Sequence, residues 1–181
     1  GIPAGAVALE KVFAMARSIL LESVLLLTGL LITGFLVTGF TCYLAFPVDA
    51  DSRGKGTLQV GDFKLVDTVG REFKLSSYSE RIVVLEWINP DCPHSLRHHL
   101  IGTFEKMQKK YAEKGVVWLA ICSNARLTAK ELETFRQERK IAYPILRDAK
   151  GEIARSFKVR TTPHLFVLNR GVKVYEGAID D

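Results

Sequence analysis

The segment from Ser23 to Phe46 contains no Asp, Glu, Lys or Arg, and it constrains the fold more than any other feature of the chain. As an α-helix it would be about 36 Å long, while the hydrocarbon layer of a bilayer is about 30 Å thick. A soluble helix of this length normally carries a polar face. The segment therefore predicts a membrane-spanning helix over 23–46, with an amphipathic leader over 1–22 at the membrane surface.

The charges beside this segment do not decide its orientation. Lys11 and Arg17 precede it, and Arg53 and Lys55 follow it, so a rule that counts Lys and Arg gives no preference. The apolar run is too long for a cleavable signal peptide. Large domains translocate largely regardless of charge, and the larger domain follows the segment. We expect a single-pass anchor in the inner (cytoplasmic) membrane, with the N-terminus cytoplasmic and the domain periplasmic.

Small residues recur within the predicted span. Gly29 and Thr33 are four residues apart, and so are Gly34 and Thr38. Small residues at this spacing let a second helix approach closely. The pattern predicts transmembrane partner subunits in the lipid bilayer, although Gly and Thr are also common in such helices without a partner.

After the span, a polar linker rich in turn residues covers 47–56, and one domain covers 57–181. Strand and helix patterns alternate along this domain, which predicts an α/β sheet. The expected elements are a hairpin over 63–67 and 72–75, strands over 81–88, 116–122 and 143–146, helices over 93–114, 128–140 and 149–157, and a hairpin over 165–169 and 172–177.

Two of the expected helices carry clear local signals. Thr128 with Glu131 three residues later predicts a capping box at the start of the helix over 128–140. The helix over 93–114 is expected to bury one apolar stripe, formed by Leu96, Leu100, Phe104, Met107 and Tyr111.

Cysteine is scarce in this chain, and no two cysteines have the C-x-x-C spacing. Cys42, Cys92 and Cys122 give neither a disulfide framework nor a zinc pair. Cys92 follows a predicted buried strand and precedes a predicted helix, so its sulfur would lie at a helix N-terminus. The amide N–H groups and the macrodipole there stabilise a thiolate. His94 would add positive charge, while Asp91 opposes the effect.

Metal, cofactor and nucleic-acid functions have little support. His94, His98 and His99 are close in sequence, but a metal site needs three or four converging ligands, and we expect these histidines to be exposed on a helix. The net charge is +5, without a basic cluster interleaved with aromatic residues. We therefore expect no metal, no cofactor and no nucleic-acid partner.

The order of motifs resembles the thioredoxin fold. The leading hairpin V-G-D-F-K-L-V-D-T-V-G-R-E-F-K-L is similar to the redoxin (AhpC/TSA, peroxiredoxin-like) family, and Thr161-Thr162-Pro163 resembles the Thr-Pro loop of thioredoxin-like proteins. The resemblance covers 58–181. It implies a thioredoxin-like domain in which Pro163 is cis and lies against the active cysteine. Thr162 and Pro163 would shape the site and bind the substrate backbone. Because the family normally closes with a further helix, we expect the domain to continue past Asp181.

The resemblance leaves two registers open for the cysteine. Cys92-Pro93-His94-Ser95 looks like the C-P-H-C of DsbA-type oxidases, with Ser95 in place of the second cysteine. Asn89-Pro90-Asp91-Cys92 instead looks like a C-x-x-C with Asn89 in the first place. Peroxiredoxins carry Thr or Ser three residues before their reactive cysteine, where this chain has Asn89.

Three further residues are candidates for the site. Glu86 interrupts an apolar strand, and the resemblance implies a proton-transfer role, although it can also point to solvent or pair with Lys or Arg. His164 either tunes the thiol or is simply partly buried. Cys122 is the candidate resolving thiol of the domain, or else a small buried apolar residue.

Two functions are consistent with these observations. The first is a membrane-tethered redoxin that acts in thiol–disulfide exchange or as a thiol peroxidase, with Cys92 as nucleophile and a thiol or disulfide protein as substrate. The second is a non-catalytic accessory subunit of a larger membrane complex, of respiratory or photosynthetic type, which uses its helix and a degenerate redoxin domain for assembly. The sequence alone does not decide whether the chain is an enzyme.

Overall fold

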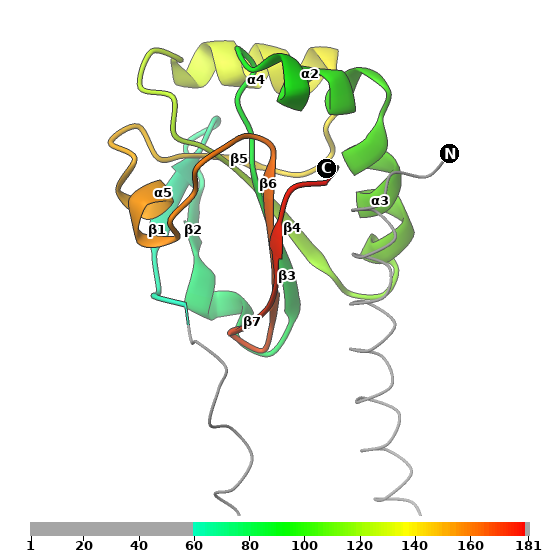
Figure 1. Cartoon of the computed structure of the whole chain (residues 1–181), viewed down its shortest axis with the longest axis vertical. Coiled ribbons are helices and arrows are strands. Elements are labelled where there is room, and N and C mark those ends of the chain that lie inside the picture. Colours follow the sequence, from blue (N-terminus) through cyan, green and yellow to red (C-terminus); the bar gives the residue numbers. More distant parts are fainter. Residues whose placement is uncertain (1–59, 180–181) are drawn as a thin grey trace, which may run out of the picture.

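The computed structural model describes residues 60–179 (Figure 1). The predicted leader, membrane span, packing residues and linker (1–22, 23–46 and 47–56) lie outside the described residues, as does the predicted continuation past Asp181. Within residues 60–179, no helix is long and apolar enough to cross a membrane.

The described chain forms a seven-stranded mixed sheet in the order β2-β1-β5-β4-β3-β6-β7. The parallel centre consists of β3, β4 and β5, and the other neighbouring pairs are antiparallel. The strands are β1 (Lys64–Asp67), β2 (Glu72–Lys74), β3 (Ile82–Trp87), β4 (Val117–Cys122), β5 (Ile145–Arg147), β6 (His164–Asn169) and β7 (Val172–Gly177). The predicted α/β sheet and both hairpins are confirmed.

Helices cover both faces of this sheet (Figure 1). They are η1 (Leu75–Tyr78), α2 (Pro93–Leu100), α3 (Thr103–Ala112), α4 (Ala129–Glu138) and α5 (Glu152–Ser156). Apolar side chains of α2, α3 and α4 pack against one face in a cluster with Val84 and Ala120. Side chains of η1 and α5 pack on the other face with Leu85 and Trp87. Because β3 and β4 alternate between these layers, both strands are almost fully buried, as their apolar sequences predict.

The single helix predicted over 93–114 is wrong, because the chain forms two helices there. Gly102 lies between α2 and α3 in the left-handed conformation, with φ of 69°, which glycine adopts without strain. The break turns Leu100 away from the predicted stripe, and its side chain is 59% exposed. Phe104 on the second helix is fully buried.

The start of α4 agrees with its sequence signal. The Thr128 hydroxyl oxygen accepts from the Glu131 N–H at 3.2 Å, and the Glu131 carboxylate accepts from the Thr128 N–H at 2.7 Å. The predicted capping box is confirmed. It satisfies orphan backbone donors at the point where the chain turns from β4 back over the sheet.

Candidate functional site

Cys92 is the N-cap residue of α2, with Pro93 in the first helical position. Its Sγ lies 3.1 Å from the backbone carbonyl oxygen of Thr162. The Thr162–Pro163 peptide bond is cis. Cys92 is half-buried, so the sulfur is supported by the protein and still open to solvent. Residues far apart in the sequence thus meet where β3 leads into α2 and the loop before β6 passes.

The groups around the sulfur favour the thiolate. Burial raises the pKa of the Cys92 thiol, but the side chain of Thr162 and the backbone N–H groups of Ser95 and His94 outweigh it, so the pKa lies below its ordinary value. Thr162 also has an opposite effect on this pKa, because the thiol donates to its backbone carbonyl oxygen. That contact favours the protonated form. The amide donors belong to the first turn of α2, as expected for a thiolate at a helix N-terminus.

The geometry distinguishes the two sequence registers. Cys92, and not Asn89, caps the helix and touches Thr162. Ser95 lies on the first turn of α2, is buried, and accepts from the Asn89 backbone N–H at 3.3 Å through its hydroxyl oxygen. Cys92 and Ser95 therefore occupy the first and second positions of a C-x-x-C motif, with a hydroxyl where the second thiol would be.

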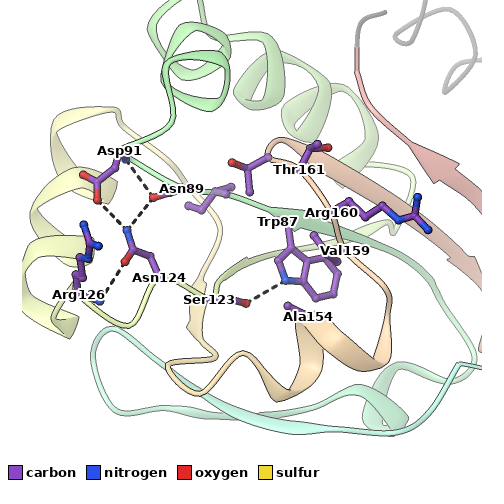
Figure 2. A pocket seen from close by; sticks show the side chains of 12 residues that line it. Trp87, Asn89, Asp91, Ser123, Asn124, Arg126, Ala154, Val159, Arg160 and Thr161 are labelled. Carbon is purple, nitrogen blue, oxygen red and sulfur yellow. Dashed lines mark hydrogen bonds between the residues drawn. The ribbon is translucent and has the colours of Figure 1, made fainter.

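Asn89 holds the loop that delivers Cys92. Its side-chain oxygen accepts from the Asp91 N–H and from the Asn124 side-chain amide, both at 3.1 Å. The same Asn124 amide donates to the Asp91 carboxylate at 2.8 Å (Figure 2). Asn124 was missed by the sequence analysis, although it follows β4 at the carboxyl end of the parallel strands, where functional groups of such sheets gather.

A cleft of about 570 Å³ opens beside this loop (Figure 2). Asp91, which precedes Cys92, and Thr162, whose carbonyl oxygen contacts the sulfur, both belong to its lining. The lining residues are Trp87, Ile88, Asn89, Asp91, Ser123, Asn124, Arg126, Ala154, Val159, Arg160, Thr161 and Thr162. The Trp87 indole N–H donates to the Ser123 hydroxyl oxygen at 3.2 Å, which fixes the floor of the cleft.

Glu86 is fully buried and has partners other than the thiol. Its Oε2 accepts from the Trp118 indole N–H at 2.8 Å and from the Tyr143 hydroxyl at 2.9 Å. Its Oε1 lies 3.0 Å from His99 Nε2, out of line for a hydrogen bond. The alternatives in which Glu86 points to solvent or pairs with Lys or Arg are wrong. Nor is it among the groups that shift the Cys92 pKa.

The expectation that the α2 histidines are exposed is wrong for two of them. His98 and His99 are 1% and 3% exposed, and only His94 is exposed. His99 can be buried because it is paired with carboxylates: its Nδ1 lies 2.8 Å from Glu105 Oε1, and its Nε2 faces Glu86. Burial lowers the pKa of His99, but the hydrogen bond to Glu105 and the negative charge of the nearby Glu86 carboxylate outweigh burial and raise the pKa to about 9.

The other two candidate histidines do not reach the sulfur with their rings in this structure. His94 lowers the Cys92 pKa through its backbone N–H. His164 stacks on Phe166 at a centroid distance of 4.7 Å, and its Nε2 lies 3.8 Å from a Glu176 carboxylate oxygen. Burial lowers the pKa of His164. The structure thus supports tuning of the thiol by backbone amides rather than by imidazole.

Cys122 ends β4 and is fully buried in the core. Burial raises the pKa of its thiol, which makes it a poor nucleophile. Cys92 and Cys122 are both free thiols in this structure. Among residues 60–179, no group of three or more His, Cys, Asp and Glu residues is arranged to hold a metal ion.

The fold, the cysteine at the N-terminus of α2 and the adjacent cis-proline loop together define a thioredoxin-like protein. The AhpC/TSA family profile matches residues 57–176, and the chain belongs to this family. No curated protein matches the chain.

Solved structures agree with the fold. A hypothetical protein from Sinorhizobium meliloti is 25% identical, with 69% of this chain and 71% of that chain covered and a TM-score of 0.64. Peroxidoxin BcpB from Mycobacterium tuberculosis is 26% identical over 66% of this chain and 82% of that chain, with a TM-score of 0.55. A thiol:disulfide interchange protein from Chlorobium tepidum is 20% identical over 67% and 85%, with a TM-score of 0.58.

Proposed function

We propose that Cys92 is the nucleophile of a thiol–disulfide exchange reaction. The observation that carries the proposal is the position of its sulfur at the N-cap of α2, 3.1 Å from the Thr162 carbonyl oxygen. A half-buried sulfur with a lowered pKa is both ionised more readily and accessible to a partner. The AhpC/TSA family membership is consistent with this chemistry.

The reaction begins when the Cys92 thiolate attacks one sulfur of a substrate disulfide. A Cys92–substrate disulfide forms, and the second substrate sulfur leaves as a thiolate. The hydroxyl of Ser95 cannot resolve this mixed disulfide, and the buried Cys122 thiol with its raised pKa is badly placed to do so. A thiol from outside the domain therefore completes the cycle. It attacks the mixed disulfide, forms a new disulfide with the substrate sulfur, and releases the Cys92 thiolate.

Exchange is favoured over peroxidase chemistry by the role of Asn89. Peroxiredoxins carry Thr or Ser at this position, whereas the Asn89 oxygen accepts two hydrogen bonds that hold the loop. The likeness to a peroxidoxin makes hydrogen peroxide the natural comparison substrate. We expect turnover with disulfides to exceed turnover with hydrogen peroxide.

The proposal is tested on the full chain in mild detergent, with Cys42 and Cys122 changed to Ser. The rate of Cys92 alkylation is measured against pH, and disulfide reduction is measured with an added thiol reductant. We expect an alkylation midpoint below the ordinary cysteine pKa, and no turnover in Cys92→Ser. Unchanged turnover in Cys92→Ser, or alkylation only after unfolding, would contradict the proposal.

We also propose that residues 23–46 tether the domain to the inner membrane, with the domain in the periplasm. The support is the uncharged run of apolar sequence. Labelling Cys92 in intact spheroplasts with a membrane-impermeant maleimide tests the orientation, and alkaline extraction of the membranes tests the tether. Labelling only after lysis, or release of the chain by alkali, would overturn this arrangement.

The second candidate function is that of an accessory subunit of a membrane complex. One observation favours it: Ser95 stands where a second thiol would complete a C-x-x-C motif. In a helix, the spacing of Gly29, Thr33, Gly34 and Thr38 would let a partner helix approach closely, which supports this candidate. Purification from native membranes decides between the functions, because a fixed stoichiometry with other subunits supports assembly and a free monomer excludes it.

A further inference from the structure

The turn between α2 and α3 exposes two adjacent large apolar side chains. Leu100 is 59% exposed and Ile101 is 57% exposed. Leu100 ends α2, Ile101 caps it, and Gly102 with its left-handed φ of 69° redirects the chain before α3 begins. Within residues 60–179, no other two exposed large apolar residues are adjacent in the sequence. An apolar pair that the core does not use marks this turn as a contact surface.

The surface beside this pair is basic. Lys106 Nζ donates to the Ile101 carbonyl oxygen at 3.0 Å, which holds the ammonium group at the turn. Lys109 and Lys110 come three and four residues after Lys106, and all three lysines are exposed. On a helix this spacing places them on one side. Arg97, in the last turn of α2, is exposed as well.

Acidic side chains do not neutralise this surface. The one acidic residue within α2 and α3 is Glu105. Its Oε1 lies 2.8 Å from Nδ1 of the buried His99, and its side chain is only 18% exposed, so the carboxylate is turned toward the interior. Glu113 and Lys114, which follow α3, cancel each other in charge. The α2–α3 face therefore combines an apolar tip with positive charge, and consists of Arg97, Leu100, Ile101, Lys106, Lys109 and Lys110.

We infer that the α2–α3 face docks on the surface of a bilayer that contains anionic lipids. Leu100 and Ile101 enter the boundary between headgroups and acyl chains, and the basic side chains lie against the anionic headgroups. Apolar side chains flanked by lysines are typical of segments that bind in the membrane interface. Interfaces between proteins are instead depleted in lysine. The composition of the face therefore favours lipid over a protein partner.

The tether proposed for residues 23–46 is compatible with this contact. The chain between Phe46 and Val60 can span at most about 50 Å, and a domain of this size is about 35 Å across. The tether therefore lets any face of the domain reach the membrane, and the α2–α3 face determines which one does. A tethered domain has a high effective concentration at the bilayer, so even a weak contact orients it.

The docking does not depend on exchange at Cys92, but it determines where the sulfur lies. Cys92 and Leu100 are at opposite ends of α2, and a helix of this length is about 12 Å long. Docking through Leu100 therefore keeps Cys92 near the headgroups, within reach of proteins at the membrane surface.

The test measures lipid contact at the turn, on the full chain in lipid nanodiscs. Cys42 and Cys92 are changed to Ser, and Cys122 is left in place because it is fully buried. A fluorophore that responds to polarity is attached at Ile101→Cys. The matched control carries it at Val69→Cys, which is 56% exposed between β1 and β2. This hairpin and α3 lie on opposite sides of the view in Figure 1.

The discs contain nitroxide-labelled lipid in phosphatidylcholine alone or in a mixture with phosphatidylglycerol. We expect the nitroxides to quench the fluorophore at Ile101→Cys strongly in the anionic discs and less in phosphatidylcholine alone, since the basic side chains then lose their partners. High salt should reduce the quenching in the anionic discs. The fluorophore at Val69→Cys should stay unquenched in both kinds of disc.

Variants identify the groups responsible. Lys109→Gln together with Lys110→Gln should lower the ratio of docked to free domain by about fivefold for each charge removed. Lys130→Gln together with Lys150→Gln is the control, because it removes the same charge from exposed positions outside the α2–α3 face; it should leave the quenching unchanged. Leu100→Gln should also reduce the quenching, and because Leu100 is exposed, this change leaves the core intact.

The outcomes separate the docking from the other proposals. Equal quenching at the two labelled positions, or quenching that is independent of phosphatidylglycerol, would overturn the docking. A fluorophore at Ile101→Cys that is shielded from water but unquenched would show that a second copy or another protein covers the pair, and would overturn it too. Dissociation of the chain from the discs would overturn the tether instead, and the docking is then measured with the labelled chain added to vesicles of the same lipids.

Discussion

His99 connects α2, which carries Cys92 at its start, to the sheet and to α3. Its ring nitrogens lie 3.0 Å from Glu86 Oε1 and 2.8 Å from Glu105 Oε1, and its side chain is fully buried. Between two carboxylates a protonated imidazole is strongly favoured, and a neutral one leaves a buried carboxylate without its cation. Loss of this proton should therefore lower the free energy of unfolding of the domain.

The structure gives the direction and the size of this effect. Burial lowers the pKa of His99, whereas the hydrogen bond to Glu105 and the negative charge of Glu86 raise it, with a net rise from 6.5 to about 9. At about 1.4 kcal/mol for each tenfold change in proton affinity, this rise corresponds to about 3 kcal/mol. Because the folded-state pKa is raised, the contribution is complete below pH 6.5. It declines as pH rises above that value and is lost once pH passes through about 9.

The measurement is urea unfolding of the full chain in mild detergent, monitored by tryptophan fluorescence. It is repeated at several pH values between about 6 and 9.5, a range that includes both the ordinary and the raised pKa of His99. His99→Gln is the comparison, because other titrating groups are common to both proteins and cancel in the difference. We expect His99→Gln to be less stable by about 3 kcal/mol at pH 6 and nearly equal at pH 9.5. A difference that stays constant with pH would refute the assignment of a charged His99.

Two further changes test the site and the fold. Ser95→Cys should form a disulfide with Cys92 in an oxidising buffer, because the Ser95 N–H already approaches the Cys92 sulfur. Free-thiol titration measures the disulfide. If both thiols persist, Cys92 and Ser95 do not occupy the two positions of a C-x-x-C motif. Thr128→Ala should lower the free energy of unfolding by about 1 kcal/mol through loss of the capping box. In urea unfolding, a change below about 0.3 kcal/mol would show that the box contributes little.

Much of the fold could be predicted because its signals are local. Buried parallel strands appear as apolar runs, and the capping box at Thr128 fixes a helix start in four residues. The break at Gly102 was missed because a glycine inside an apolar helical pattern is tolerated as often as it ends a helix. Only the packing of Phe104 beneath the sheet, with Leu100 left exposed, decides between these outcomes.

The site was predicted less completely because its contacts join distant segments. The position of Cys92 before a helix is visible in the sequence, but its contact with Thr162 spans 70 residues. The partners of Glu86 come from β4, from the loop before β5 and from α2. No periodic pattern records such pairings, so the histidine facing Glu86 was expected on the surface.

The arrangement of charges also determines how the thiol ionises. Glu86 is engaged by Trp118, Tyr143 and His99, and none of these groups shifts the Cys92 pKa. The proton of the Cys92 thiol therefore leaves to solvent or to the substrate rather than to a buried carboxylate. The thiolate is stabilised by backbone amides, whose dipoles are fixed at every pH. Reactivity at Cys92 should follow a single ionisation at the sulfur, while the stability of the domain follows the separate ionisation of His99.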